Sequence, residues 1–125
     1  MKSYARLVAE AGRLLEKGRT KRAKELYQEA VAQRPTGAEA LTGLAYAYLD
    51  RGQTVTAVAL FKRALAAPHG HPPALFGLGE AYGEQGDRDA ALAVFKRYLA
   101  RYPSGQEAEM ARRQIEQLSS PAAAR

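Results

Sequence analysis

Side chains that could do chemistry are few in this chain of 125 residues. His69 and His71 flank Gly70 and could hold a surface metal ion, but two imidazoles without cysteine or a nearby carboxylate offer too few ligands for zinc. Cysteine is absent, which excludes disulfides and thiol nucleophiles. A glycine-rich phosphate loop and a Ser/His/Asp set are also missing. We therefore predict no enzyme activity, no metal site and no cofactor, and interpret both histidines as part of a polar connector.

An internal repeat organises the chain. Gly18, Gly52 and Gly86 are 34 residues apart, and three alanines and several apolar positions keep the same spacing. The further columns are Ala23, Ala57 and Ala91; Leu7, Leu41 and Leu75; Leu14, Tyr48 and Tyr82; Tyr27, Phe61 and Phe95; and Pro35 with Pro103. A period of this length indicates stacked units that bury a shared core.

The third copy of the repeat has the fullest pattern, which reads Leu75-x2-Leu78-Gly79-x2-Tyr82, then Ala91-x3-Phe95 and Pro103. It resembles the tetratricopeptide repeat, a helix–turn–helix unit, with Leu75 in place of the family's leading tryptophan. The resemblance covers residues 4–105. It implies an all-α, right-handed solenoid of three repeats that works as a protein-interaction module.

The spacing of apolar residues predicts the same helices without the family pattern. Leu41, Leu44 and Tyr48 lie on one stripe of a helix. We expect the repeated glycines to end helices in the left-handed conformation, and the repeated alanines to let paired helices cross closely. Seven helices are expected near residues 3–17, 20–33, 37–50, 54–67, 72–84, 88–101 and 105–118.

Helix starts are also marked in the sequence. Residues 36–39 and 104–107 have the Ser/Thr-x-x-Glu spacing of capping boxes. Asp87 is expected to cap the helix that begins near Arg88, and Asp89 to complement the dipole of that helix.

We predict one domain over residues 1–118, with repeats at about 4–37, 38–71 and 72–105. The last helix, 105–118, is half polar, so we expect it to cover the apolar face of the third repeat. Its apolar side is expected to contain Ala108, Met110, Ala111, Ile115 and Leu118. Residues 119–125 have nothing to bury and are expected to form a flexible tail.

The net charge of +6 is concentrated near the N-terminus. A basic patch there could meet phosphate, anionic lipid or an acidic protein, or could be an ordinary solvated face. It consists of Lys17, Arg19, Lys21, Arg22 and Lys24. No aromatic residue is interleaved with these bases, so nucleic acid is not an expected partner. No apolar run reaches the ~20 residues needed to cross a bilayer, so we expect no membrane partner and a cytoplasmic location. The chain could also be an excised domain of a longer protein.

The first helix of each repeat should line the concave groove of such a solenoid. By analogy with the family, the groove residues expected to bind a partner are Val8, Gly12, Leu15, Thr42, Gly43, Tyr46, Leu49, Asp50, Phe76, Gly77, Glu80 and Glu84. These residues are apolar, small or acidic, and none is basic. We therefore expect a protein or peptide partner that has both apolar and basic residues.

Two kinds of groove residue admit different interpretations. Tyr46 and Phe76 are off the packing stripes of their helices, so we expect them to be exposed anchors for a partner. Gly43 and Gly77 could deepen the groove or relieve crowding against a neighbouring helix. For Gly12 we favour the interpretation that it deepens the groove. Each glycine costs about 1 kcal/mol relative to alanine inside a helix, which something must offset.

One activity of the resembled family is not expected here. Members that hold the acidic C-terminus of Hsp70 or Hsp90 use lysine, asparagine and arginine side chains, because a carboxylate pair needs such donors. The matching positions hold Val8, Gly12, Gly43, Pro73 and Gly77, none of which has a side-chain donor. Two alternatives to the scaffold or adaptor function remain open. They are a secretion-type chaperone for an apolar client segment and an electrostatic tether to nucleic acid or anionic membrane through the basic patch.

Overall fold

The computed structural model describes residues 1–68 and 70–120. Within these ranges the chain forms seven α-helices and no strand. The helices are α1 (Tyr4–Glu16), α2 (Thr20–Gln33), α3 (Ala38–Asp50), α4 (Thr54–Leu65), α5 (Pro72–Gln85), α6 (Arg88–Arg101) and α7 (Gln106–Ser119). The expected helix boundaries are therefore correct to within two residues at every end.

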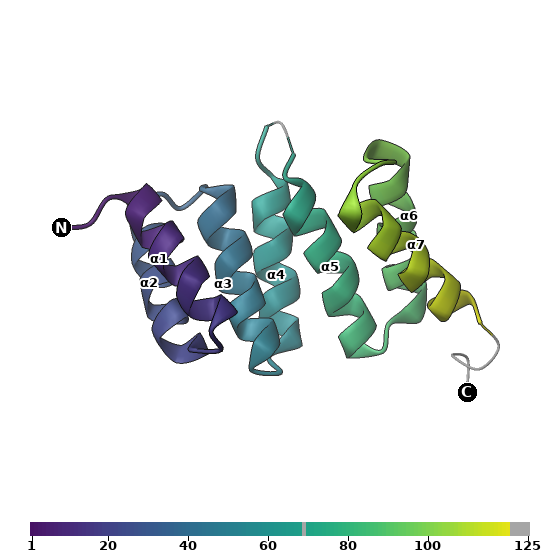
Figure 1. The fold of residues 1–125 in the computed structure, drawn as a ribbon, viewed down its shortest axis with the longest axis horizontal. Coiled ribbons are helices and arrows are strands. Elements are labelled where there is room, and N and C mark those ends of the chain that lie inside the picture. Colours follow the sequence, from purple (N-terminus) through teal and green to yellow (C-terminus); the bar gives the residue numbers. More distant parts are fainter. Residues whose placement is uncertain (69, 121–125) are drawn as a thin grey trace.

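The helices stack as three hairpins followed by one single helix (Figure 1). Each hairpin packs against the next, and the first helices α1, α3 and α5 also contact their neighbours in the row. One hydrophobic core runs through all three repeats and extends into α7. The all-α solenoid of three repeats with a terminal helix is confirmed.

The glycine turns that separate paired helices also agree with the prediction. Gly18, Gly52 and Gly86 have φ values of +77°, +77° and +81°, which residues with a side chain rarely adopt. The three alanines that follow these turns in the repeat are completely buried, as expected where two helices cross closely. A glycine turn and a small crossing residue therefore fix the geometry of each hairpin.

The predicted capping boxes are wrong, although Asp87 does cap α6 through a 3.1 Å bond from the Ala90 N–H to its Oδ1. The N-caps of α3 and α7 are glycines 37 and 105, one residue later than expected, and a glycine has no side chain that could cap its own helix. At α3, the side chain of Tyr4 from the preceding repeat caps the helix instead. Its hydroxyl accepts from the Ala40 N–H and donates to Glu39, both at 3.1 Å.

The terminal helix α7 covers the end of the third repeat. Ala108 and Ala111 are completely buried, and Ile115 and Leu118 pack against the core. Met110 was expected on this apolar side, but its side chain is 37% exposed because it lies off the stripe that faces α6. Of the expected tail, Ser119 belongs to the helix, Ser120 is its C-cap, and residues 121–125 lie outside the described residues.

Candidate functional site

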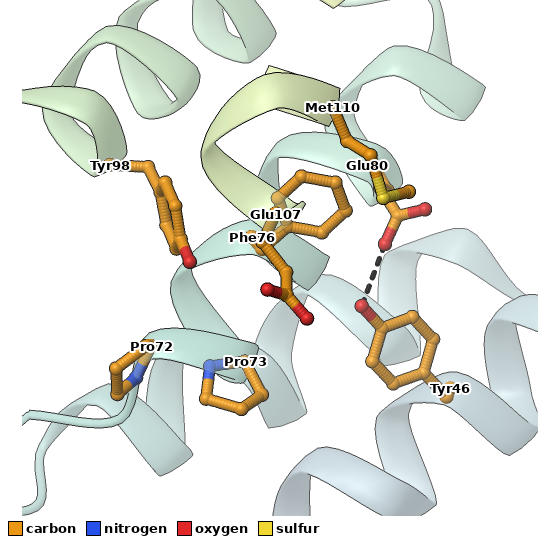
Figure 2. A pocket seen from close by; sticks show the side chains of 8 residues that line it. All are labelled: Tyr46, Pro72, Pro73, Phe76, Glu80, Tyr98, Glu107 and Met110. Atoms are coloured by element: carbon orange, nitrogen blue, oxygen red, sulfur yellow. Dashed lines mark hydrogen bonds between the residues drawn. The ribbon is translucent and has the colours of Figure 1, made fainter. Parts of the chain in front are cut away.

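A pocket of about 480 Å³ lies where α3, α5, α6 and α7 come together. Figure 2 shows its side chains, which project from all four helices. The lining consists of Tyr46, Pro72, Pro73, Phe76, Glu80, Tyr98, Glu107 and Met110. We call this the α5–α7 pocket.

The pocket exists because the last helix is placed differently from the others. Helices α1 and α3 contact each other, and so do α3 and α5, but α7 packs on α6 and has little direct contact with α5 in the described part of the chain. Residues at the start of α5 and along α7 therefore face a space that no neighbouring helix fills. Prolines 72 and 73 form the first turn of α5 and one side of this space, as Figure 2 shows.

A hydrogen bond between neighbouring repeats holds one wall of the α5–α7 pocket. The Tyr46 hydroxyl donates to Glu80 Oε1 at 2.7 Å. The Tyr46 ring packs edge-on against Phe61, with ring centroids 5.0 Å apart, which fixes its direction. Burial beside Glu80 raises the pKa of Tyr46, so the phenol stays protonated and remains a donor.

The carboxyl group of Glu80 is the main polar feature of this wall. Burial raises its pKa, the hydrogen bond from Tyr46 lowers it in part, and the negative charges of Glu84 and Asp50 raise it further. Burial also raises the pKa of Asp50. Within residues 1–68 and 70–120, no lysine or arginine forms an ion pair with Glu80.

The floor of the pocket is aromatic. Phe76 packs edge-on against Phe95 and Tyr98, with ring centroids 5.5 and 5.7 Å apart. The predicted exposure of Phe76 is wrong, because these rings leave its side chain only 5% exposed. Phe76 shapes the floor as a core residue, whereas Tyr46 is half-buried and does present surface to the pocket.

The charges at the α5–α7 pocket are all negative. Among residues 1–68 and 70–120, Glu80 and Glu107 line it, and no lysine or arginine does. The ion pairs found within residues 1–68 and 70–120 lie elsewhere, between Glu10 and bases of the first repeat and between Arg22 and Glu25. Within the described part of the chain, the pocket thus combines apolar walls with acidic groups that form no ion pair.

Of the groove residues expected from the sequence, Tyr46, Phe76 and Glu80 come together at this pocket. The expected residues of the first repeat do not reach it: they are half-buried, and two of them pack against the core. These are Val8, Gly12 and Leu15. Asp50 and Glu84 are exposed and influence Glu80 only through their charge.

Four further groove residues are buried and present no surface for a partner, namely Thr42, Gly43, Leu49 and Gly77. The two glycines relieve crowding. A Cβ atom on Gly43 would lie 2.1 Å from the Tyr27 ring, and one on Gly77 would lie 2.3 Å from the Phe61 ring. At Gly12 a Cβ would meet only the Tyr27 hydroxyl at 3.6 Å, so the crowding explanation does not apply there.

Tyr98, Glu107 and Met110 were not expected in the groove. Tyr98 comes from a second helix, and the other two come from a helix predicted to act only as a cap. One signal was present in the sequence: residues 108, 111, 115 and 118 form a regular apolar stripe, and Met110 lies outside it. An apolar residue off such a stripe indicates a second apolar surface.

The other candidates from the sequence are the two histidines and the basic patch. His71 is half-buried, and burial lowers its pKa, while His69 lies outside the described residues. The described ranges contain no group of three or more side chains able to hold a metal ion. None of the helices in these ranges is both long and apolar enough to span a membrane. In the basic patch, Arg22 pairs with Glu25, and the Lys24 ammonium lies over the Tyr48 ring.

A family model for the tetratricopeptide repeat matches residues 14–67 and 48–115 of the chain. No curated protein matches the chain by sequence. Among solved structures, the first tetratricopeptide repeat domain of human RPAP3 has a TM-score of 0.83 at 21% identity, covering 92% of this chain and 91% of that one.

Two further solved structures contain bound peptides. The second such domain of human RPAP3, in complex with the HSP70 peptide SGPTIEEVD, has a TM-score of 0.78 at 20% identity, over 90% of this chain and 91% of that one. The Yersinia enterocolitica type III secretion chaperone SycD, in complex with a peptide of the translocator YopD, has a TM-score of 0.82 at 14% identity, over 91% and 90%. At these identities the likeness shows the fold alone.

Proposed function

The chain belongs to the tetratricopeptide repeat family, and on that premise we propose that it is a non-catalytic protein-interaction module, a scaffold or adaptor that binds a peptide or helix of a partner protein. The α5–α7 pocket is the binding site in this proposal. The observation that carries it is a cavity with aromatic walls that, among the described residues, is lined by two carboxylates and no base. Apolar area of this kind supplies affinity when it is desolvated, and the acids select a partner segment that has basic residues.

Proteins with the same fold bind chemically different peptides. Human RPAP3 holds an HSP70 peptide that ends in Glu-Glu-Val-Asp, and SycD holds a segment of a translocator. The fold therefore does not choose the partner, and the chemistry of the site has to do so. An acidic peptide would place like charges against Glu80 and Glu107, which costs binding energy, so we expect no binding of Hsp70 or Hsp90 tails.

Selection from a displayed library of random peptides, with the domain immobilised, tests this function. We expect the enriched peptides to contain lysine or arginine next to apolar residues. Their affinity should fall by about 2 kcal/mol or more in Tyr46→Ala, because a half-buried aromatic at the centre of a site is a typical hot spot. The peptide SGPTIEEVD should not bind. A melting curve of each variant shows whether weaker binding comes from a lost contact or from an unfolded protein.

The other outcomes of this experiment identify the alternatives. Affinity that survives Glu80→Lys but disappears in Lys21→Glu with Lys24→Glu would place binding on the basic patch and favour the tether. Enrichment of uncharged apolar stretches would favour a chaperone for an apolar client. Failure to enrich any peptide that depends on Tyr46 or Glu80 would contradict the proposed function.

A further inference from the structure

Glu80 is held in place by its own protein but is not neutralised by it. Its Oε1 atom accepts a hydrogen bond from the Tyr46 hydroxyl, and no lysine or arginine within residues 1–68 and 70–120 forms an ion pair with it. Glu107 lies on the same pocket, on the exposed first turn of α7, and forms no ion pair among residues 1–68 and 70–120. Two acids from different helices thus border one cavity to which the described part of the chain contributes no lysine or arginine.

The remaining walls suit a long basic side chain. Tyr46, Phe76 and Tyr98 supply aromatic carbon, and Met110 supplies a thioether. Figure 2 shows Tyr46 and Tyr98 on different sides of the opening, with Glu107 between them. A lysine or arginine places its methylene stem against such carbon while its charged head meets carboxylates and ring faces. The cavity of about 480 Å³ has room for such a side chain.

We propose that the α5–α7 pocket is a subsite for one basic side chain of the partner, whose ammonium or guanidinium group binds between Glu80 and Glu107. This inference rests on the proposed function and deepens it, because the deepest contact of the partner is then a cation and not an apolar anchor. It also gives α7 a second role. The helix that covers the third repeat contributes Glu107 and Met110 to the subsite.

Matched capped amino acids test the charge requirement without a known partner. The probes are N-acetyl, N′-methylamide forms of arginine and lysine, compared with citrulline and norleucine as their uncharged counterparts. The chain has two methionines, so protein labelled with ¹³C at the methionine methyl groups gives one signal in the pocket, from Met110, and one remote reference, from Met1.

We expect arginine and lysine probes to shift the Met110 signal in a saturable way and to leave Met1 unchanged. Citrulline and norleucine should bind at least about tenfold more weakly, since a charged hydrogen bond is worth about 1.4 kcal/mol or more. Glu80→Gln should weaken the cationic probes about tenfold while it keeps an acceptor for Tyr46. Glu107→Gln should also weaken them. Glu109→Gln makes the same charge change on α7 away from the pocket lining and should have no effect.

Equal binding of charged and uncharged probes would overturn this inference and make the pocket an apolar subsite, with the proposed function still standing. No response of Met110 to any probe would also overturn it. The proposed function is judged separately, by whether library-selected peptides depend on Tyr46 and Glu80. The two proposals can therefore fail independently.

Discussion

The second helix of each repeat carries one buried aromatic ring of the same repeat column. This ring packs differently where the first two repeats meet the next helix than where the third repeat meets α7. Tyr27 and Phe61 lie against glycines of the next repeat, where an added Cβ would be 2.1 and 2.3 Å from the ring. Phe95, in the same column, lies against Gly79 of its own repeat, with an added Cβ only 2.8 Å away. The position in α7 that corresponds to the two glycines is Ala111.

The repeat column that contains Gly79 has the opposite order of glycine and alanine. Gly79 corresponds to Ala11 and Ala45 in the first two repeats, both completely buried. At each of the first two junctions, the ring's own repeat thus has an alanine and the next repeat has a glycine. At the third junction the ring's own repeat has the glycine, and α7 has the alanine. We infer that this exchange turns the Phe95 ring back into its own repeat, so that α7 is not drawn against α5 and the α5–α7 pocket stays open.

Removing α7 should have the largest effect on stability. A chain of residues 1–104 loses the two completely buried alanines of α7 and the packing of Ile115 and Leu118 against the core. We expect it to be destabilised by about 3 kcal/mol or more and to associate through the exposed end, because burying each large aliphatic side chain contributes about 1.5–3 kcal/mol. Chemical denaturation and sedimentation would measure both effects. A truncated chain that is monomeric and equally stable would contradict the role of α7 as a cap.

Alanine at the junction glycines tests the first two junctions. Gly77→Ala should cost about 1–3 kcal/mol, because the new methyl group overlaps the Phe61 ring and the tightly packed core has to shift. Gly83→Ala is the matched control in the same helix. Its Cβ would meet nothing within 4 Å, so we expect a gain of about 0.5–1 kcal/mol from helix propensity. Equal free energies of unfolding for the two variants would remove the packing explanation.

Exchanging the glycine and the alanine at the last junction tests whether these two residues set the position of α7. Gly79→Ala alone should destabilise the fold, because its methyl group overlaps the Phe95 ring. Adding Ala111→Gly should recover about 1 kcal/mol, a coupling that residues sharing a neighbour commonly show. The double variant should also bring α7 closer to α5 and shift the Met110 methyl signal. Strictly additive single effects would show that the two positions are independent.

Most of the fold could be predicted because its determinants are local. Glycine turns, apolar stripes and Asp87 act within a few residues, so the helix boundaries were nearly correct. The predicted capping box at residues 36–39 is wrong because Tyr4, from the preceding repeat, caps α3 instead. The site was predicted only in part, since Tyr98 and Met110 reach the pocket through the placement of α6 and α7, which depends on packing between repeats.

The smallest expected effect is the pH dependence of stability at Glu80. Its pKa is raised in the folded protein, so the folded state binds this proton more tightly than the unfolded state does. Stability relative to Glu80→Gln should therefore be greatest below the ordinary glutamate pKa of 4.5 and fall as pH rises through the higher folded value. Asp50 and Glu84 add negative charge nearby and reinforce this direction. Denaturation midpoints of both proteins between acidic and neutral pH would show the difference, and an opposite slope would contradict the raised pKa.

Site-specific photo-crosslinking tests the central claim that partners bind at the α5–α7 pocket. A photoreactive phenylalanine derivative would replace Met110 at the pocket or Val55 on α4, an exposed apolar side chain outside it. With a library-selected peptide, we predict a crosslink from position 110, none from position 55, and loss of the crosslink when Glu80→Lys is added. A crosslink from position 55, or one from position 110 that persists with Glu80→Lys, would contradict the account.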